Sequence, residues 1–201
     1  MVNSYIMIMK VIAFSGAQNS GKTTLMKAYA KSLEASGSKV QTGYKVPEGV
    51  DASISRRSKR LGFGINEETS FESQYHIMLS YLLADMETRK QAEVDGVDWI
   101  VYDRSIMDHL PYAHKVSNGR DYFMLEDMSN QHRQRFPIDY TVYCYPVPFD
   151  NDGHRSISQE FQDDIVERFD SIMPAPDVRL PNVSIKERID LLDRYLFIEE
   201  E

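Results

Sequence analysis

One eight-residue stretch near the start of the chain constrains its fold more than any other feature. Residues 16–23 read Gly-Ala-Gln-Asn-Ser-Gly-Lys-Thr, which is the spacing G-x-x-x-x-G-K-[ST]. In this pattern the glycines let the backbone wrap around a phosphate, and the helix that follows directs its N-terminal amides at the charge. An apolar run at 11–14 precedes the pattern and helical spacing at 23–34 follows it. The sequence therefore predicts a strand, a phosphate-binding loop and a helix, in that order.

Each polar residue of this loop has an expected contact with a nucleoside triphosphate. Lys22 supplies a point charge to the phosphates, Thr23 supplies a hydroxyl to Mg²⁺, and Thr24 reaches the α-phosphate. The other residues expected at the triphosphate are Gly16, Asn19, Ser20 and Gly21. We therefore expect ATP with Mg²⁺ as the bound cofactors.

The rest of the chain continues the alternation of strands and helices. Apolar runs predict further strands at 99–102 and 140–145, and we also expect short strands at 39–44 and 178–180. Periodic segments predict helices at 70–94, 105–115, 121–135, 158–172 and 185–196, with a loop and a short helix at 46–69. Most of the periodic apolar residues of 70–94 are expected in the core: Phe71, Tyr75, Met78, Leu79, Leu82, Leu83 and Met86. We expect one three-layer α/β domain over 1–201, with a mainly parallel five-stranded sheet between helices and a lid at about 149–157.

Composition and charge favour a small substrate in a reducing compartment. The chain has 23 basic and 31 acidic side chains, a net charge of −8, and this gives no general footprint for nucleic acid. The single cysteine, Cys144, lies in an apolar run and is expected in the core. No export signal and no membrane span is apparent in the sequence, so we expect a cytoplasmic protein. The oligomeric state stays open, a homodimer included.

Two residues at a strand end suggest the chemistry on the acceptor side. Asp103 and Arg104 follow the run 99–102 directly, and open α/β sheets bind ligands at the carboxyl ends of their strands. A carboxylate there binds Mg²⁺ or acts as the base toward an acceptor hydroxyl, and an arginine holds the substrate or the transferring phosphoryl group. The simpler alternative is a salt bridge at the surface.

Two further candidates lie in loops. Arg155 belongs to the polar stretch 152–156, where a lid arginine could neutralise the transferring phosphoryl group. Its alternative is a solvated loop arginine. Glu48 follows the second predicted strand, where a carboxylate could contact an acceptor hydroxyl or a sugar.

The start of the helix at 70–94 offers groups for recognising a base. Gln74 has both a donor and an acceptor for a base edge, and Phe71 or Tyr75 could stack on a ring. The alternative for these aromatic residues is the core. We expect His109 and His114 on a helix surface or behind the site.

A basic segment precedes that helix. Four cationic residues could hold a phosphate that the acceptor already carries, and a solvated basic loop is the alternative: Arg56, Arg57, Lys59 and Arg60.

The order of these motifs resembles the ribosylnicotinamide kinase domain of NadR and related small kinases, which are similar to deoxynucleoside and thymidylate kinases. The resemblance covers about 10–172 and rests on 16–24, Glu48, the segment through Gln74, 99–105 and 152–162. It implies ATP, Mg²⁺ and transfer of the γ-phosphoryl group to a nucleoside or nucleotide. On this hypothesis the base is Glu48 or Asp103.

Two other function classes remain open on the sequence. A kinase acting on a polynucleotide end or a modified DNA base would use the local basic segments, against the net charge of −8. A non-kinase nucleotide switch would need no acceptor. The chain lacks the guanine-reading Asn-Lys-x-Asp of GTPases, and the lid-like arginine fits phosphoryl transfer better.

Overall fold

The computed structural model describes residues 9–46, 53–146 and 158–198, and within them the sheet has five strands in the order β2-β3-β1-β4-β5. Every neighbouring pair is parallel. The strands are β1 Lys10–Ser15, β2 Val40–Thr42, β3 Trp99–Asp103, β4 Tyr140–Cys144 and β5 Val178–Leu180. The predicted five-stranded parallel sheet is confirmed, and the strand that leads into the phosphate loop lies at its centre.

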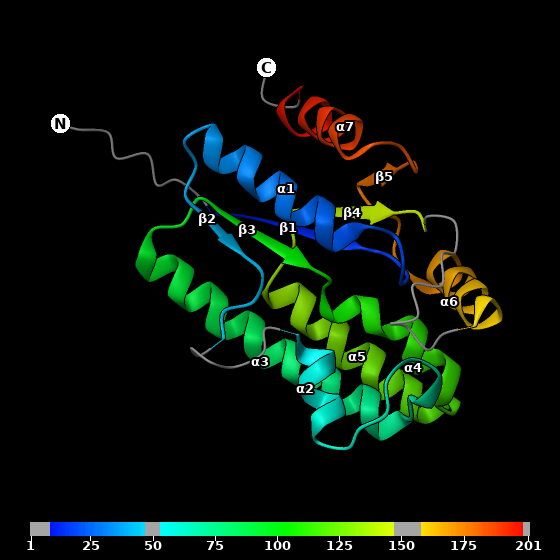
Figure 1. The fold of residues 1–201 in the computed structure, drawn as a ribbon. Helices are drawn as coiled ribbons and strands as arrows, with labels where there is room; N and C mark the ends of the chain where they lie inside the picture. Colours follow the sequence, from blue (N-terminus) through cyan, green and yellow to red (C-terminus); the bar gives the residue numbers. More distant parts are fainter. Residues whose placement is uncertain (1–8, 47–52, 147–157, 199–201) are drawn as a thin grey trace.

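Helices cover both faces of this sheet and give three layers (Figure 1). In Figure 1, α1 and α7 lie on one face, and α2, α3, α4 and α5 lie on the other. The helices are α1 Lys22–Ala35, α2 Ile54–Arg60, α3 Phe71–Asp95, α4 Leu110–Val116, α5 Gly119–Arg135, α6 Gln159–Ile172 and α7 Ile185–Ile198. Two short 3₁₀ helices, η1 Asn66–Glu68 and η2 Ile106–His109, precede α3 and α4. Among the described helices, none is both long enough and apolar enough to cross a membrane.

The two sides of β1 belong to different parts of the core, because successive side chains of a strand point to opposite faces. Ile12 and Phe14 pack with α1 and α7, whereas Val11 and Ala13 pack with Ala92 of α3. These four side chains of β1 are all buried. Cys144 is buried in the first of these clusters, as expected.

The parallel register brings the phosphate loop and the acidic strand end together. Phe14 of β1 pairs with Asp103 of β3, so both strands end at the same edge of the sheet. The main-chain N–H of Arg104 then donates to the carbonyl of Phe14 (3.0 Å). This edge is where open parallel sheets bind ligands.

The long helix α3 has the predicted bounds, but the face that it buries differs from the expectation. Ser70 caps its start by accepting a hydrogen bond from Ser73 N (3.2 Å), and Gly96, with φ of 63°, ends it. Four of the residues expected in the core are exposed: Tyr75, Leu79, Leu83 and Met86. The helix instead buries several polar residues, Ser73, Gln74, Asp85 and Thr88. The expectation was wrong because polar groups of the functional region occupy the inner face of this helix.

Candidate active site

The phosphate loop requires glycine at both glycine positions of the pattern, 16 and 21, for different reasons. Gly16 has φ of 134°, and a Cβ there would lie 2.6 Å from the carbonyl oxygen of Cys144. Gly21 has φ of 70°, a left-handed backbone conformation that residues other than glycine rarely adopt without strain. Asn19 also has a positive φ, 56°, within the loop. Thr24, expected near the α-phosphate, is exposed in the first turn of α1.

Lys22 is buried inside the loop that it follows. Its Nζ donates to the carbonyl of Ala17 (2.9 Å) and lies 3.5 Å from the hydroxyl oxygen of Ser20. Burial, and then the neighbouring charge of Arg104, lower the pKa of Lys22 to about 7. The amine therefore lies where a triphosphate would approach, in surroundings that favour an anionic partner.

Thr23 and Asp103 form the pair that could hold a metal ion. The Thr23 hydroxyl donates to Asp103 Oδ2 (2.5 Å), and Asp103 Oδ1 is buried without a hydrogen-bond partner among the described residues. Hydroxyl and carboxylate oxygens are the hard ligands that Mg²⁺ prefers. The donor set therefore fits Mg²⁺, although the described residues contain no group of three or more acidic, histidine or cysteine side chains placed for a metal.

Arg104 holds an unusual backbone conformation between the loop and the rest of the site. Its φ is 74°, which costs a non-glycine residue about 1–3 kcal/mol. Its Nη1 donates to the carbonyl of Gly16 (3.2 Å), and its own carbonyl accepts from the Tyr44 hydroxyl (2.9 Å). Burial alone would lower the pKa of Arg104, but Tyr112 and Asp108 outweigh it and raise the pKa above its ordinary value. The guanidinium is thus a fixed cation beside the first loop glycine.

Asp108, which has no predicted role from the sequence, connects the start of the phosphate loop with the segment that follows β3 through hydrogen bonds. The carboxylate is completely buried; Oδ1 accepts from Ser15 Oγ (2.8 Å) and Gly16 N (3.0 Å). Oδ2 accepts from Ser105 N (2.8 Å) and Ser105 Oγ (3.1 Å). The only sequence signal was the S-x-x-D spacing of Ser105 and Asp108, which is that of a capping box with Asp in place of Glu.

Arg188 of α7 supports the loop from the C-terminal end of the chain and was also missed. Its Nη1 donates to the carbonyl of Ser20 (3.1 Å), and its Nη2 donates to Asn182 Oδ1 (3.1 Å). The side chain is buried. No sequence pattern connects it with a loop 168 positions earlier, so only the fold could show this contact.

A cavity of about 50 Å³ adjoins the phosphate loop, and Gln18 of the loop forms part of its wall. Three polar atoms of its lining are buried without a hydrogen-bond partner among the described residues: Gln74 Oε1, His109 Nε2 and the Tyr112 hydroxyl oxygen. Gln74 Nε2 already donates to Thr69 Oγ1 (2.5 Å), which leaves the amide oxygen as an acceptor. The full lining is Gln18, Ser55, Ile65, Asn66, Gln74, Ile77, Arg104, His109 and Tyr112. Buried polar atoms of this kind suit a ligand with hydrogen-bonding edges.

The position of His109 corrects the sequence expectation. His109 is 4% exposed and lines the cavity instead of lying on a helix surface. Burial, followed by the charges of Arg104 and Lys22, holds the pKa of His109 well below its ordinary value, so the ring is neutral at pH 7. Tyr112, which had no assigned role, lies under the Arg104 guanidinium at 5.8 Å. His114 is exposed, as expected.

The remaining sequence candidates fall into two groups. Phe71 and Tyr75 stack on each other with ring centroids 6.0 Å apart, and neither lines the cavity. Glu48, and Arg155 with the expected lid, lie outside the described residues. Their roles stay predictions.

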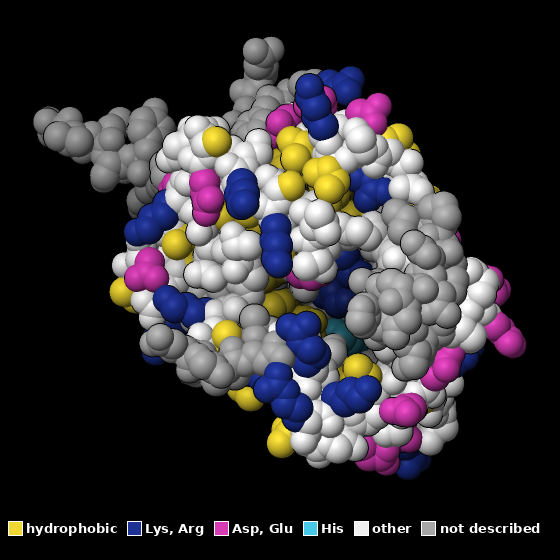
Figure 2. Space-filling view, viewed as in Figure 1, with side chains coloured by type: hydrophobic (Ala, Val, Ile, Leu, Met, Phe, Trp, Pro, Cys, Tyr) yellow, Lys and Arg dark blue, Asp and Glu magenta, His cyan; other side chains and the backbone are white. Residues whose placement is uncertain are grey.

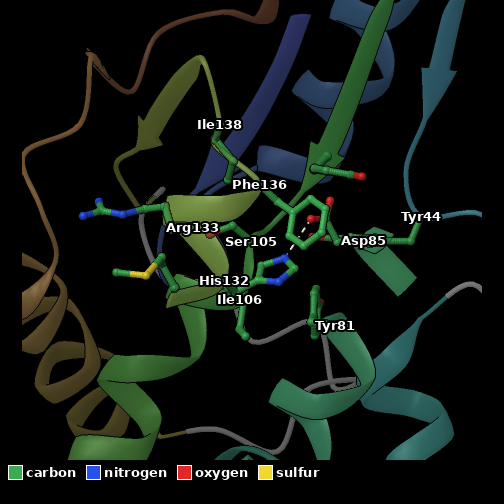
Figure 3. A pocket seen from close by; sticks show the side chains of 11 residues that line it. Tyr44, Tyr81, Asp85, Ser105, Ile106, His132, Arg133, Phe136 and Ile138 are labelled. Atoms are coloured by element: carbon green, nitrogen blue, oxygen red, sulfur yellow. Dashed lines mark hydrogen bonds and ion pairs between the residues drawn. The ribbon is translucent and has the colours of Figure 1, made fainter. Parts of the chain in front are cut away.

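A second, smaller cavity is lined in part by two members of a buried ionic network, Asp85 and His132 (Figure 3). His132 Nε2 lies 2.8 Å from Asp85 Oδ2, the dashed contact in Figure 3, and Arg89 Nε lies 3.0 Å from both Asp85 oxygens. Tyr44 lines this cavity and also donates to the Arg104 carbonyl. Tyr44 therefore connects the wall of this cavity with the backbone of Arg104.

Replacing Asp85 with asparagine is expected to lower the free energy of unfolding by about 2 kcal/mol at pH 7, since hydrogen bonds to charged groups are lost. Burial would raise the pKa of Asp85, but the His132 hydrogen bond and the Arg89 charge outweigh it and lower the pKa. This stabilisation is present above the unfolded pKa of about 3.9 and is lost as the pH falls through the lower folded pKa. Denaturant unfolding at pH 7 and pH 3 checks this: the difference between wild type and Asp85→Asn should shrink at pH 3. An equal difference at both pH values would contradict it.

Comparison with known proteins agrees with this geometry. A family model described as an AAA domain matches residues 11–188. The chain belongs to this AAA-domain family. The matched range of the AAA domain begins at β1 and ends at Arg188, and so includes every contact of the loop described above. A search of curated proteins finds no match.

Two solved structures share the fold of this AAA domain. One is deoxyadenosine kinase from M. mycoides with bound dATP, at 18% identity and a TM-score of 0.60 over 94% of this chain and 99% of that chain. The other is NadR protein in complex with NR, at 14% identity and a TM-score of 0.63 over 93% of this chain and 50% of that chain. This chain therefore spans about half of the NadR chain. The likeness confirms the kinase-like fold that the motifs indicated.

Proposed function

We propose that this protein transfers the γ-phosphoryl group of ATP to a nucleoside, a nucleoside monophosphate or a nucleoside-like small molecule. One observation carries the proposal: a polar cavity with unpartnered Gln74 and His109 atoms adjoins the phosphate loop at Gln18. A nucleotide switch needs only the loop, whereas a kinase needs a second place beside it for the acceptor. The kinase-like fold shared with deoxyadenosine kinase and NadR supports the same choice.

The charges around the loop suit phosphoryl transfer. Lys22 donates to the carbonyl of Ala17, and Arg104 donates to the carbonyl of Gly16. Both cations could therefore neutralise charge on the transferring group. Thr23 and Asp103 would hold Mg²⁺, which when bound neutralises charge on the β- and γ-phosphate oxygens. Arg155 is proposed as a further cation on that group. Each cation acts most where negative charge develops, on the equatorial oxygens.

The hydrogen bond between Thr23 and Asp103 bears on which carboxylate acts as the general base. Because Asp103 already accepts from Thr23, we assign it to the metal ion and propose Glu48 as the base. Glu48 would take the proton of the acceptor hydroxyl while the hydroxyl oxygen forms a bond to the γ-phosphorus. The bond from that phosphorus to the β–γ bridging oxygen breaks, and ADP leaves with the electron pair.

A thermal-shift screen of nucleosides tests the acceptor site. With a non-hydrolysable ATP analogue and Mg²⁺ present, an acceptor that binds the folded protein should raise its melting temperature. Gln74→Ala should weaken binding of that acceptor about tenfold, since one buried hydrogen bond to the ligand is lost. Gln131→Ala is the matched control, because Gln131 is an exposed glutamine of α5 and does not line the cavity. Equal weakening by both variants would reject the cavity as the acceptor site.

A polynucleotide acceptor is the second candidate. The observation that favours it is the set of cations on α2, beside the cavity wall at Ser55.

A further inference from the structure

The short helix α2 concentrates positive charge in an otherwise acidic protein. Its seven residues include four cations and no acidic residue: Arg56, Arg57, Lys59 and Arg60. The whole chain carries a net charge of −8. Arg56, Lys59 and Arg60 are exposed, whereas Arg57 is half-buried. Four cations within seven residues create a local positive potential, which attracts anionic groups such as phosphate.

The helix presents some of these cations toward the acceptor cavity and one away from it. Ile54 and Ser58 are buried, with Ile54 in the core against α3, and Ser55 lines the cavity. Lys59 follows Ser55 by one turn and therefore shares its side of the helix, with Arg56 next to that side. Arg57 lies on the opposite side, where it lines a different cavity with Glu87 and His76.

The surface view agrees with this placement. Figure 2 shows Lys and Arg side chains gathered over α2 along one edge of a hollow in this face. Further cationic side chains are visible inside the hollow. Cationic side chains therefore lie both at the edge formed by α2 and inside the hollow.

The size of the enclosed cavity leaves part of the acceptor outside it. About 50 Å³ holds only a few water molecules, since each needs about 10–15 Å³ by the same measure. A cavity of this size receives one edge of a base or sugar. The remainder of the acceptor must lie at the mouth, whose wall at Ser55 belongs to α2. A neutral nucleoside would gain nothing from cations at that mouth.

We propose that the face of α2 formed by Arg56 and Lys59 binds a phosphate group that the acceptor already carries. The preferred acceptor is then a nucleotide unit, either a free nucleoside monophosphate or a nucleotide within a single strand of nucleic acid. This proposal rests on the kinase function proposed above and specifies its substrate class. Arginine and lysine are the side chains that recognise phosphate oxygens, through a bidentate fork and a point charge respectively.

Equilibrium binding tests the phosphate site independently of catalysis. We would titrate a deoxynucleoside, its 5′-monophosphate and an eight-nucleotide single-stranded DNA into protein saturated with a non-hydrolysable ATP analogue and Mg²⁺, which keeps the ligands from the phosphate loop. The proteins are wild type, the double variant Arg56→Gln/Lys59→Gln and the control Arg57→Gln. The control removes one charge from the same helix on the side away from the cavity, so it measures the general effect of charge.

Wild type should bind a phosphate-bearing ligand at least about tenfold more tightly than the nucleoside, because two charge-assisted contacts are added. The double variant should lose that advantage while its affinity for the nucleoside stays within about twofold. Arg57→Gln should remain near wild type. A monophosphate that binds as well as the DNA identifies a mononucleotide acceptor, and tighter DNA binding that weakens steeply with salt identifies a nucleic-acid strand.

Two results would overturn the phosphate site: no preference for the phosphate-bearing ligands, or an equal loss in Arg57→Gln and the double variant. Binding that depends on Arg56 and Lys59 without phosphoryl transfer to any of the ligands would overturn the kinase function instead.

Discussion

Lys22→Met is expected to lower kcat for phosphoryl transfer about 10²- to 10³-fold, the range lost when one fixed electrostatic group is removed from a transition-state site. Methionine has a similar length and fills the same buried space, so the fold should persist. The matched control is Lys27→Met, since Lys27 is an exposed lysine of the same helix. Initial rates with saturating ATP measure the effect. A Lys22→Met protein as active as the Lys27→Met protein would contradict the role of Lys22.

Proton uptake by the protein during nucleotide binding gives a second measurement of the role of Lys22. The pKa of Lys22 is lowered to about 7 by burial and by Arg104. Triphosphate oxygens beside the amine favour its charged form and raise that pKa, so nucleotide binding at a slightly alkaline pH should take up a proton. Titration calorimetry in two buffers of different ionisation enthalpy measures this uptake, which should be absent in Lys22→Met.

Asp108→Ala is expected to lower the free energy of unfolding by about 3–5 kcal/mol, as when one partner of a buried ionic pair is removed. The substitution leaves the N–H groups of Gly16 and Ser105 without their acceptor and removes the carboxylate 3.9 Å from Arg104 Nη1. Because the same groups shape the phosphate loop, ATP affinity should also fall. Denaturant unfolding and nucleotide titration measure the two effects.

Asp127→Ala is the control for Asp108. Asp127 is exposed on α5 and accepts a hydrogen bond from Gln131 only one turn away (2.7 Å). Its loss should change stability by less than about 0.5 kcal/mol. If Asp108→Ala matched this control in stability and nucleotide affinity, the hydrogen bonds of Asp108 would not be what stabilises the phosphate loop.

The parts of the fold that the sequence predicted have local signals. The phosphate loop has a fixed spacing, and the three central strands β3, β1 and β4 are short segments rich in apolar residues. Asp103 and Arg104 could be placed because parallel strands end at one edge of the sheet. Gln74 was identified from its donor and acceptor groups near a helix start, and the structure brings it into the cavity with Arg104.

The residues that were missed have roles that depend on distant partners. Asp108 contacts Ser15 and Gly16, more than 90 positions earlier, and Arg188 contacts Ser20. His109 was expected on a helix surface or behind the site, because nothing in its neighbourhood along the chain indicates that it lines a cavity. Only the packing of η2 against α3 brings it into the cavity wall.

The inner face of α3 shows why periodicity alone could not define this site. Apolar spacing predicted that Tyr75, Leu79 and Leu83 lie inside, and all three are exposed. Gln74 and Asp85 are buried instead, because a cavity and an ionic network supply partners for polar groups that an apolar core would not. Functional sites are where such departures from hydrophobic patterning are expected.

Transfer of label from γ-labelled ATP is the most direct measurement of kinase activity for this protein. Wild type, Mg²⁺ and labelled ATP would be incubated with deoxynucleosides, ribonucleosides, their monophosphates and short single-stranded DNA, and the products separated. We expect label on one class of acceptor in amounts equal to the ADP formed, and none with Lys22→Met. Label released only as inorganic phosphate, at a rate that no acceptor changes, would contradict the kinase function.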